Sequence, residues 1–445
     1  MLNSKLTDSQ QDVWLYANQI TSRLEYVSRF VFETVLNCKL RLIDELQITN
    51  PTFLKTHFII NYSERFIENT FHIIPHGLLS MSGSYDFRLL KSQSAYGTLV
   101  IGTQKKPADL FSAIFYFISR AEEWQNRFRD MHDRFCKDSV FSDEFDFTEP
   151  YVDQWIEELR VKLNHTNTHF KIAKPEFKCT YTFDIDNGFA FLGKPLWKNV
   201  LALLKDVVQF NFLFVKHRIN TLKGNTADPF DQYENIIQHI LKYKLHTIFF
   251  FLVNRNVKYD RGANLNSKVY ANLFNRIRQS NISSGLHPSY TSFETSNQIE
   301  NERTMLETHL AKSIDISRQH FLKFNIRNTP NALLRAGITE DWSMGFSDIL
   351  GFRARTTHAF LYFNFDTEQM EPICLKPFSI MDGVFYIHQG VSVLKAKEYV
   401  EKHKNLIRKT GGNFVMVFHE RIFSELHHPG FSKFFFEITE TNSQV

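Results

Sequence analysis

The spacing of apolar residues predicts helices in the first part of the chain. Between about residues 10 and 40, apolar side chains recur every three to four positions, which favours one amphipathic helix. A second stripe of this kind begins after Pro107. Runs rich in β-branched and aromatic residues lie between the two stripes, at residues 58–60, 71–74 and 98–101. These features predict a smaller N-terminal α/β unit of roughly 150 residues.

The pattern changes from Cys179 onward, where strand-like runs alternate with helical stretches. The expected strands cover residues 179–186, 247–253, 283–288, 315–321, 337–342, 373–382 and 413–419. Strands that alternate with helices form parallel sheets, so the seven runs predict an α/β fold with a closed or nearly closed (β/α) barrel. The turn-forming run at residues 164–169 marks the join, and we expect domains at residues 1–172 and 173–445.

Two carboxylates end the first barrel strand, in the run Thr182-Phe183-Asp184-Ile185-Asp186. Residues i and i+2 of a strand point to the same side, so Asp184 and Asp186 would project together from one face. Two like charges held this close bind a cation, or the pKa of one carboxyl rises and that group becomes a base.

Other polar residues also fall at the predicted strand ends, where a barrel places its active site. They are His287, Arg318, His320, Glu340, Asp341, Asp382 and His419. A single histidine in such a place is commonly a packed residue, whereas the whole set is hard to explain by packing. An aspartate and two histidines form a three-ligand site for a divalent metal. With a second carboxylate as base and a histidine as acid, such a site hydrolyses an amide.

Composition narrows the class of function. The 445 residues are 43% hydrophobic and 22% charged, which is typical of a globular protein of two or three domains. A net charge of +4 without a block of Lys or Arg gives no footprint for nucleic acid or anionic lipid. The four cysteines are isolated in the sequence and fit buried thiols in a reducing compartment.

The sequence also bears on location. The N-terminus lacks the apolar segment of a signal peptide, and no run of about 18 apolar residues occurs. We therefore expect a cytoplasmic protein with no nucleic-acid partner and no transmembrane segment.

An apolar insertion follows the first barrel strand, at residues 196–215. Leu, Val and Phe dominate it, and Lys205 and Asp206 interrupt it. We expect a buried or lid-forming helical segment. The alternative is peripheral contact with a membrane or a lipid substrate, since the run is too charged to span a bilayer.

Residues from about 178 to 425 resemble the polysaccharide deacetylase (NodB-like) superfamily of carbohydrate esterases. The whole chain is similar to a divergent bacterial branch, common in Bacteroidetes, in which an uncharacterised N-terminal domain precedes the barrel. The runs that carry the resemblance are 182–186, 285–290, 317–322, 337–346, 351–354 and 418–419, with 118–124 and 150–155 in the N-terminal domain. The resemblance implies a distorted (β/α)7 barrel after a smaller N-terminal α/β domain.

The resemblance also implies a metal site. In the superfamily's first motif the first aspartate is the general base and the second binds metal, which makes Asp184 the base and Asp186 a ligand, although Ile185 separates them here. The second motif carries two histidines four positions apart. Here His287 is present and position 291 is Thr, so His320 would supply the third ligand.

The remaining roles follow in the same way. Arg318 would orient the base, and His419 would act as the acid. Candidates for binding the substrate are Tyr290, Glu340, Asp341, Arg353 and Asp382.

Together these residues predict a metal-dependent hydrolase that removes an N-acetyl, or O-acetyl, group from a sugar or glycan precursor in surface-polysaccharide metabolism. The expected metal is Zn²⁺, with Co²⁺, Ni²⁺ or Mn²⁺ as alternatives. The alternative function is a catalytically inactive glycan-binding or assembly protein on the same fold. A weaker alternative is a metal-dependent phosphoesterase.

Overall fold

The structure is a computed structural model that describes residues 11–82, 90–101, 109–126, 128–136, 146–166, 171–254, 259–260, 264–292 and 297–440. The first elements are β1 (Asp12–Ala17), α1 (Ser22–Arg29), η1 (Phe30–Val35), β2 (Lys39–Ile43), α2 (Glu45–Ile48), α3 (Pro51–Thr56), β3 (Ile59–Tyr62), β4 (Phe71–His72), η2 (Leu78–Ser80), β5 (Leu90–Ser94), β6 (Gly97–Ile101), α4 (Leu110–Ile118), α5 (Ala121–Gln125) and α6 (Tyr151–Thr166).

The elements from residue 177 onward build a second sheet and its helices. They are β7 (Phe177–Ile185), α7 (Leu196–Val208), α8 (Phe212–Leu222), α9 (Tyr233–Tyr243), β8 (His246–Leu252), α10 (Lys268–Ser280), β9 (Ser283–His287), α11 (Gln298–Leu310), β10 (Ile316–Ser317), η3 (His320–Leu322), α12 (Thr329–Arg335), β11 (Glu340–Met344), β12 (Phe360–Asn364), β13 (Gln369–Pro377), β14 (Ile380–Met381), η4 (Val384–His388), α13 (Val393–Thr410), β15 (Gly412–His419), η5 (Glu420–Phe423) and α14 (Phe434–Glu440).

A four-stranded parallel sheet organises the N-terminal part, in the order β2-β1-β3-β4. The expected helix over residues 10–40 is wrong at its start, because residues 12–17 form β1. These residues are mostly apolar or aromatic, and β1 pairs with β2 on one side and β3 on the other. The helical stripe begins only with α1. The β-rich runs near residues 59, 71 and 98 do contain strands, β3, β4 and β6.

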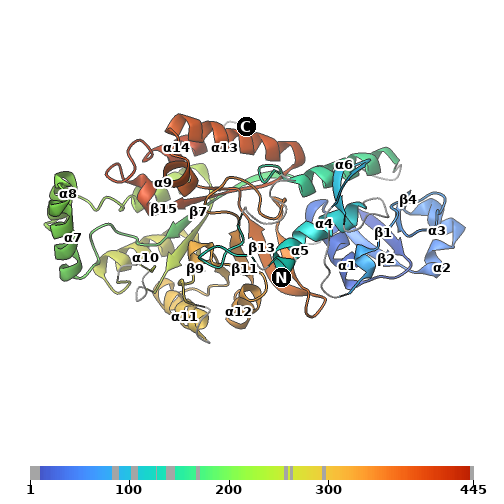
Figure 1. Cartoon of the computed structure of the whole chain (residues 1–445), viewed down its shortest axis with the longest axis horizontal. Coiled ribbons are helices and arrows are strands. Elements are labelled where there is room, and N and C mark those ends of the chain that lie inside the picture. The colour runs from blue at the N-terminus through green and yellow to red at the C-terminus, as the bar shows by residue number, and fades with distance from the viewer. Residues whose placement is uncertain are drawn as a thin grey trace.

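A curled nine-stranded sheet forms the larger part of the molecule, in the order β12-β13-β11-β10-β9-β8-β7-β15-β14. Every pairing in it is parallel except that of β12 with β13. β7 lies between β8 and β15, inside the sheet. Helices flank the sheet, so the expected mixed α/β architecture with a barrel-like sheet is confirmed (Figure 1).

The two ends of this sheet are joined by one stretch of chain. β13 pairs with β11 near one end of the strand order, and β14, which starts three residues after β13 stops, pairs with β15 at the other end. The Phe378 N–H donates to the Met344 carbonyl at 3.1 Å, while the next N–H, of Ser379, donates to the Val415 carbonyl at 3.1 Å. The sheet therefore curls until its ends share neighbouring residues.

Two strand boundaries differ from the expectation in ways that matter for the site. β10 covers only Ile316–Ser317, so Arg318 and His320 lie beyond it. β11 begins at Glu340, three residues later than predicted. The antiparallel β12 was not expected. Four of its five residues are buried, so no alternation of apolar and polar positions marks it.

Buried side chains connect the N-terminal elements to the large sheet. One cluster of buried apolar side chains that contact one another has members in both parts of the chain, from Val13 to Ile438. The Tyr26 hydroxyl donates to the Leu361 carbonyl at 2.7 Å, and Arg353 donates to both carboxylate oxygens of Glu123 at 2.8 and 2.7 Å. The division at residues 172 and 173 stays a prediction. α6 continues to Thr166, and residues 167–169 of the expected join lie outside the described residues.

Figure 1 places the N-terminal sheet at one end of the molecule, the large sheet in the middle and helices α7 and α8 at the other end. Among the described residues, no helix combines the length and the apolar character needed to cross a membrane.

Candidate metal centre

The last residues of β7 deliver the two carboxylates that the sequence singled out. Asp184 is the last but one residue of the strand and is buried, and Asp186 is the first residue after it, with 16% of its side chain exposed. Both side chains line the same cavity, as the i, i+2 spacing predicted.

Two histidines approach Asp186 from neighbouring strands of the sheet. His287 ends β9, and His320 follows β10. The Nε2 atoms of His287 and His320 lie 3.2 and 3.6 Å from Asp186 Oδ1. His320 is followed by Phe321 and Leu322 with φ of 59° and 52°, a left-handed conformation that costs energy for such residues and is found mainly at functional sites.

The Nδ1 atom of each imidazole already has a hydrogen-bond partner. His287 Nδ1 lies 2.6 Å from the Arg318 carbonyl oxygen, and His320 Nδ1 lies 2.7 Å from Asp260 Oδ1. A carbonyl or carboxylate oxygen can only accept, so both Nδ1 atoms carry the proton. The neutral form of each ring therefore presents the Nε2 lone pair to Asp186. This is the arrangement by which proteins orient histidine ligands to metals.

These three residues fit a divalent cation. One ligand atom from each of Asp186, His287 and His320 lies within 4.8 Å of the other two. Asp186 Oδ1 is buried and accepts no hydrogen bond of good geometry, whereas Oδ2 accepts one from Arg421 Nη2 at 2.6 Å. A buried carboxylate oxygen without a donor is costly, and a cation between the three atoms would remove that cost. The nitrogen and oxygen donors suit Zn²⁺ and related metals.

The charge around the three ligands also favours a cation. Five carboxyl groups but only three guanidinium groups lie at this site: Asp184, Asp186, Asp260, Asp382 and Glu420 against Arg134, Arg318 and Arg421. Burial opposes ionisation of His287, yet the carboxylates of Asp184 and Asp186 raise its pKa above the ordinary value. The surroundings thus attract positive charge to the position between the ligands.

Arg318 holds the Asp184 carboxylate in place. Its Nη1 donates to Asp184 Oδ1 at 2.8 Å and to Thr182 Oγ1 at 2.7 Å, and its Nε donates to the Trp342 carbonyl at 3.0 Å. Arg318 is fully buried, with its guanidinium 4.6 Å from the ring centre of Phe250. The arginine therefore fixes one oxygen of Asp184.

His419 ends β15, which pairs with β7 so that His419 lies beside Asp184 in the strand register. Its Nδ1 lies 2.7 Å from Asp382 Oδ1, so Nδ1 donates and the ring is held by a buried carboxylate. Burial by itself would lower the pKa of His419, but the Asp382 carboxylate more than offsets it and raises the pKa to about 9. His419 is thus protonated near neutral pH, and its Nε2 lies 4.0 Å from Asp186 Oδ2. Asp382 serves as the partner of His419 and not as a lining residue.

Four of the predicted substrate-binding residues lie elsewhere. Glu340 is the first residue of β11, so it lies at the end of the strands that is away from the cavity. Its carboxylate pairs with Lys376 at 3.3 Å. Asp341 is buried inside the sheet, where Ser317 Oγ donates to it at 2.8 Å. Arg353 pairs with Glu123 of helix α5, in the N-terminal part. Tyr290 lies just outside the cavity, with its hydroxyl 3.0 Å from His132 Nδ1.

Sequence reasoning missed three groups that touch the ligands. Asp260 orients His320 from a loop, where no periodic pattern marks it. Glu420 accepts a bond from the Asp186 N–H at 3.3 Å, and burial together with the Asp186 carboxylate raises its pKa to about 7. Arg421 pairs with Asp186. Glu420 and Arg421 directly follow His419, so the rule that found His419 would have found them one and two residues later.

The cavity at this site has a volume of about 290 Å³. Phe321, Met381, Tyr386 and Ile387 form apolar and aromatic parts of its wall. A segment of the N-terminal part completes it: Arg134 Nη1 donates to the Phe321 carbonyl at 3.1 Å and to Ser347 Oγ at 2.8 Å, and His132 lies beside it. The sequence had given the N-terminal part no role at the site.

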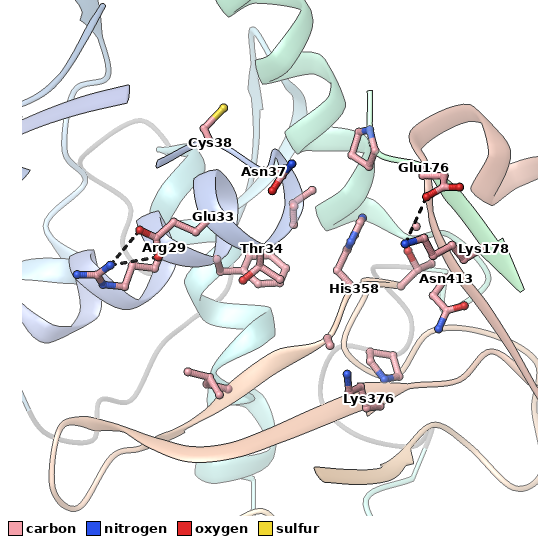
Figure 2. Close-up of a pocket in the computed structure, with 18 of the residues that line it drawn as sticks. Arg29, Glu33, Thr34, Asn37, Cys38, Glu176, Lys178, His358, Lys376 and Asn413 are labelled. Atoms are coloured by element: carbon pink, nitrogen blue, oxygen red, sulfur yellow. Dashed lines mark hydrogen bonds and ion pairs between the residues drawn. The ribbon is translucent and has the colours of Figure 1, made fainter. Parts of the chain in front are cut away.

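A second and larger cavity, of about 780 Å³, lies at the other end of the strands (Figure 2). It is lined by Lys178 and Asn413 at the starts of β7 and β15, and by residues of α1 and η1. Figure 2 shows Arg29 paired with Glu33, and Lys178 paired with Glu176. We call it the base cavity, and the one at the ligands the mouth cavity.

Comparison with known proteins adds little to the geometric evidence. A protein family described as "Family of unknown function (DUF7033)" matches residues 13–168. No curated protein matches the chain. A solved structure described as "Crystal structure of putative polysaccharide deacetylase from Mycobacterium smegmatis" is 14% identical, with a TM-score of 0.41, over 62% of this chain and 87% of that chain. At that TM-score the likeness carries no argument, so the case for a function rests on the geometry of the site.

Proposed function

We propose that this protein is a metal-dependent hydrolase that removes an acetyl group, N-linked or O-linked, from a sugar or glycan precursor. The observation that carries the proposal is the convergence of Asp186, His287 and His320, with their donor atoms within 4.8 Å, in a cavity that a second carboxylate and a further histidine also line. The proposal includes a division into an N-terminal domain, residues 1–172, and a barrel domain, residues 173–445.

Asp186, His287 and His320 would hold the cation. A divalent metal such as Zn²⁺ supplies Lewis acidity when bound and brings the pKa of water toward neutrality. Asp184 is proposed as the general base: its carboxylate lines the cavity, and Arg318 fixes one of its oxygens at 2.8 Å. Fixing the carboxylate in advance avoids its reorganisation during the reaction.

His419 is proposed as the general acid. The raised pKa, about 9, keeps the ring protonated at neutral pH, so its Nε2–H can be given to the leaving nitrogen or oxygen of the sugar. Asp382 holds the ring so that this proton faces the cavity. Deacetylation needs both a base and an acid at the site.

The mouth cavity is consistent with a small, partly apolar group. Its volume of about 290 Å³ is at the lower limit for ligand pockets, and its aromatic and aliphatic walls suit a sugar face or an acetyl methyl. Its size and walls support an acetyl group on one sugar unit more than a large acyl group.

The proposal is tested by metal analysis and acetate release on the full-length protein. We expect about one Zn²⁺ per chain and acetate release from acetylated amino sugars. Asp186→Asn should lower metal affinity by about 100-fold or more and abolish acetate release. Asp366→Asn, at an exposed aspartate away from the site, is the matched control and should change neither.

Two results would contradict the proposal in different ways. If the protein binds no divalent metal, Asp186, His287 and His320 are not metal ligands and the proposal fails. A protein that binds metal through Asp186 but releases no acetate from N- or O-acetylated sugars favours the glycan-binding alternative.

A further inference from the structure

The helices that follow β7 expose an unusual amount of apolar surface. α7 and α8 form a hairpin at the end of the molecule farthest from the N-terminal sheet (Figure 1). The exposed fractions of Leu196, Val208 and Phe210 are 77%, 76% and 78%. The expectation of a buried segment at residues 196–215 is therefore wrong, because its apolar side chains face outward.

The buried residues of the two helices are polar instead. Within α7 only Asn199 is buried, and within α8 only Arg218 and Thr221. Arg218 donates to Asn199 Oδ1 at 3.1 Å and to Asp206 Oδ2 at 2.8 Å, which ties the two helices together. A hairpin adapted to water has the reverse arrangement. This inversion indicates that its outer face is covered in the working protein.

The apolar residues of α7 lie on a single face. Leu196, Trp197, Val200, Leu201, Leu204 and Val208 fall on an arc of about 140° when placed at 3.6 residues per turn. Each of them is more than half exposed. Lys198 and Lys205, both exposed, lie beside this arc. Such a helix, with an apolar face flanked by lysines, is typical of a helix that lies in a membrane interface.

Aromatic residues form the tip. Phe210, in the turn between the helices, has φ of 57°, a conformation that favours glycine or asparagine. Its ring centre lies 6.1 Å from that of Phe212, and the two side chains are 78% and 62% exposed. The turn thus keeps a strained phenylalanine where a small polar residue would fit without cost.

The charge of the hairpin selects the partner. Residues 194–223 contain six lysine or arginine residues and one aspartate, an excess of five positive charges. The one aspartate, Asp206, is engaged by Arg218 inside the hairpin. Lysines along one edge of an apolar face complement the negative charge of anionic lipid headgroups. The small net charge of the whole chain, +4, had hidden this local excess.

We propose that the α7–α8 hairpin docks the protein on an anionic lipid bilayer, with the tip and the apolar face of α7 in the boundary between headgroups and acyl chains. Hydrogen bonds hold the base of the hairpin in place. Asp228, which is buried, accepts bonds from the N–H groups of Ala190, Phe191 and Leu192 at 2.7, 2.8 and 2.9 Å. The docking surface is therefore fixed relative to the end of β7.

Flotation with lipid vesicles tests the proposal on the full-length protein, with or without metal. We expect binding to vesicles that contain phosphatidylglycerol and little binding to pure phosphatidylcholine. Phe210→Asp combined with Phe212→Asp should weaken partitioning on the order of 100-fold. Lys198→Glu combined with Lys205→Glu should weaken it roughly 10-fold. The control is Phe66→Asp, at a 74% exposed phenylalanine of the N-terminal part, which should bind like the wild type.

The fluorescence of Trp197 gives a second measurement of vesicle binding. It is 60% exposed, whereas Trp124, Trp155 and Trp342 are buried. Its emission should shift to shorter wavelength on anionic vesicles, and the shift should vanish in Trp197→Phe. These measurements do not depend on hydrolysis, so failure of the proposed function leaves them valid.

Three outcomes would overturn the proposal. The first is absence of flotation with anionic vesicles. The second is flotation that the Phe210→Asp and Phe212→Asp double variant leaves unchanged. The third is a lipid-free dimer that this double variant dissociates, which would assign the apolar face to a second copy of the chain.

Discussion

The two cavities lie at opposite ends of the strands of the large sheet. They differ in whether their polar groups remain available to bind a ligand. In the base cavity the charged residues neutralise one another: Arg29 pairs with Glu33, and Lys178 with Glu176. One imidazole nitrogen there, His358 Nε2, is buried without a hydrogen bond. In the mouth cavity a carboxylate oxygen and two imidazole nitrogens point toward a common position.

The smaller cavity is therefore the better candidate for chemistry. The base cavity has more than twice the volume of the mouth cavity, about 780 against about 290 Å³. Volume alone measures how imperfectly two parts of the chain pack. Converging donor atoms whose other bonds are satisfied need a ligand to complete them.

The largest expected effect is on the acid at the mouth. Asp382→Asn removes the charge that keeps His419 protonated, so acetate release should fall by about 10²–10⁴-fold at neutral pH. Metal content should stay near that of the wild type, because Asp382 contacts none of the three ligands. The measurement is the rate of acetate release with zinc analysis on the same sample; loss of the metal would contradict the separate roles.

A second effect distinguishes the two cavities by pH. The His419 pKa is raised from 6.5 to about 9, so its stabilisation of the metal-free fold is complete below 6.5 and lost as the pH rises through 9. The loss amounts to about 3 kcal/mol. In the base cavity, burial lowers the pKa of His358, which costs stability as the pH falls below 6.5.

Urea unfolding of the chelator-treated protein between pH 5 and pH 10 measures both contributions. Asp382→Asn should flatten the alkaline decline, and His358→Gln should flatten the acid one. If Asp382→Asn leaves the alkaline decline intact, His419 is not its source.

A third effect concerns the orientation of a ligand. Asp260→Ala removes the carboxylate that His320 Nδ1 donates to, which should lower zinc affinity by about 10–100-fold. Asp260→Asn keeps an acceptor and should lose less. Competition with a zinc-binding dye measures the affinity, and an unchanged value for Asp260→Ala would show that His320 is not a ligand.

The smallest effect is expected at the base cavity. Lys178 and Glu176 are 67% and 78% exposed, so Lys178→Ala should change the free energy of unfolding by less than about 1 kcal/mol. Zinc affinity and acetate release should match the wild type. A loss of activity in this variant would reverse the ranking of the two cavities.

The sequence was most informative where a side chain follows a buried strand. Asp184, Asp186, His287 and His419 all lie at strand ends, and a parallel sheet gathers such ends on one side. Glu340 shows how the same rule fails. A strand boundary misplaced by three residues moved it from the start of β11 to the predicted end.

Contacts between distant segments were beyond sequence reasoning. Arg353 meets Glu123 across 230 positions of the chain, and Asp260 reaches His320 from an irregular loop. The apolar hairpin was misjudged for a different reason. Its composition resembles that of a buried helix, and only the structure shows that Asn199 and Arg218 occupy the inside.

The short link between β13 and β14 separates the site into two mechanical halves. Asp186 follows the nine-residue strand β7 and His287 ends the central strand β9, whereas Asp382 follows the two-residue strand β14. Breaking the hydrogen bonds that the Phe378, Ser379 and Asp382 N–H groups donate, together with the pairing of β14 with β15, would part the ends of the sheet and release Asp382 while the ligands stay in place. Amide hydrogens along this seam should exchange with solvent sooner than those of β7. Catalytic competence would then be lost by local opening well before the fold itself is lost.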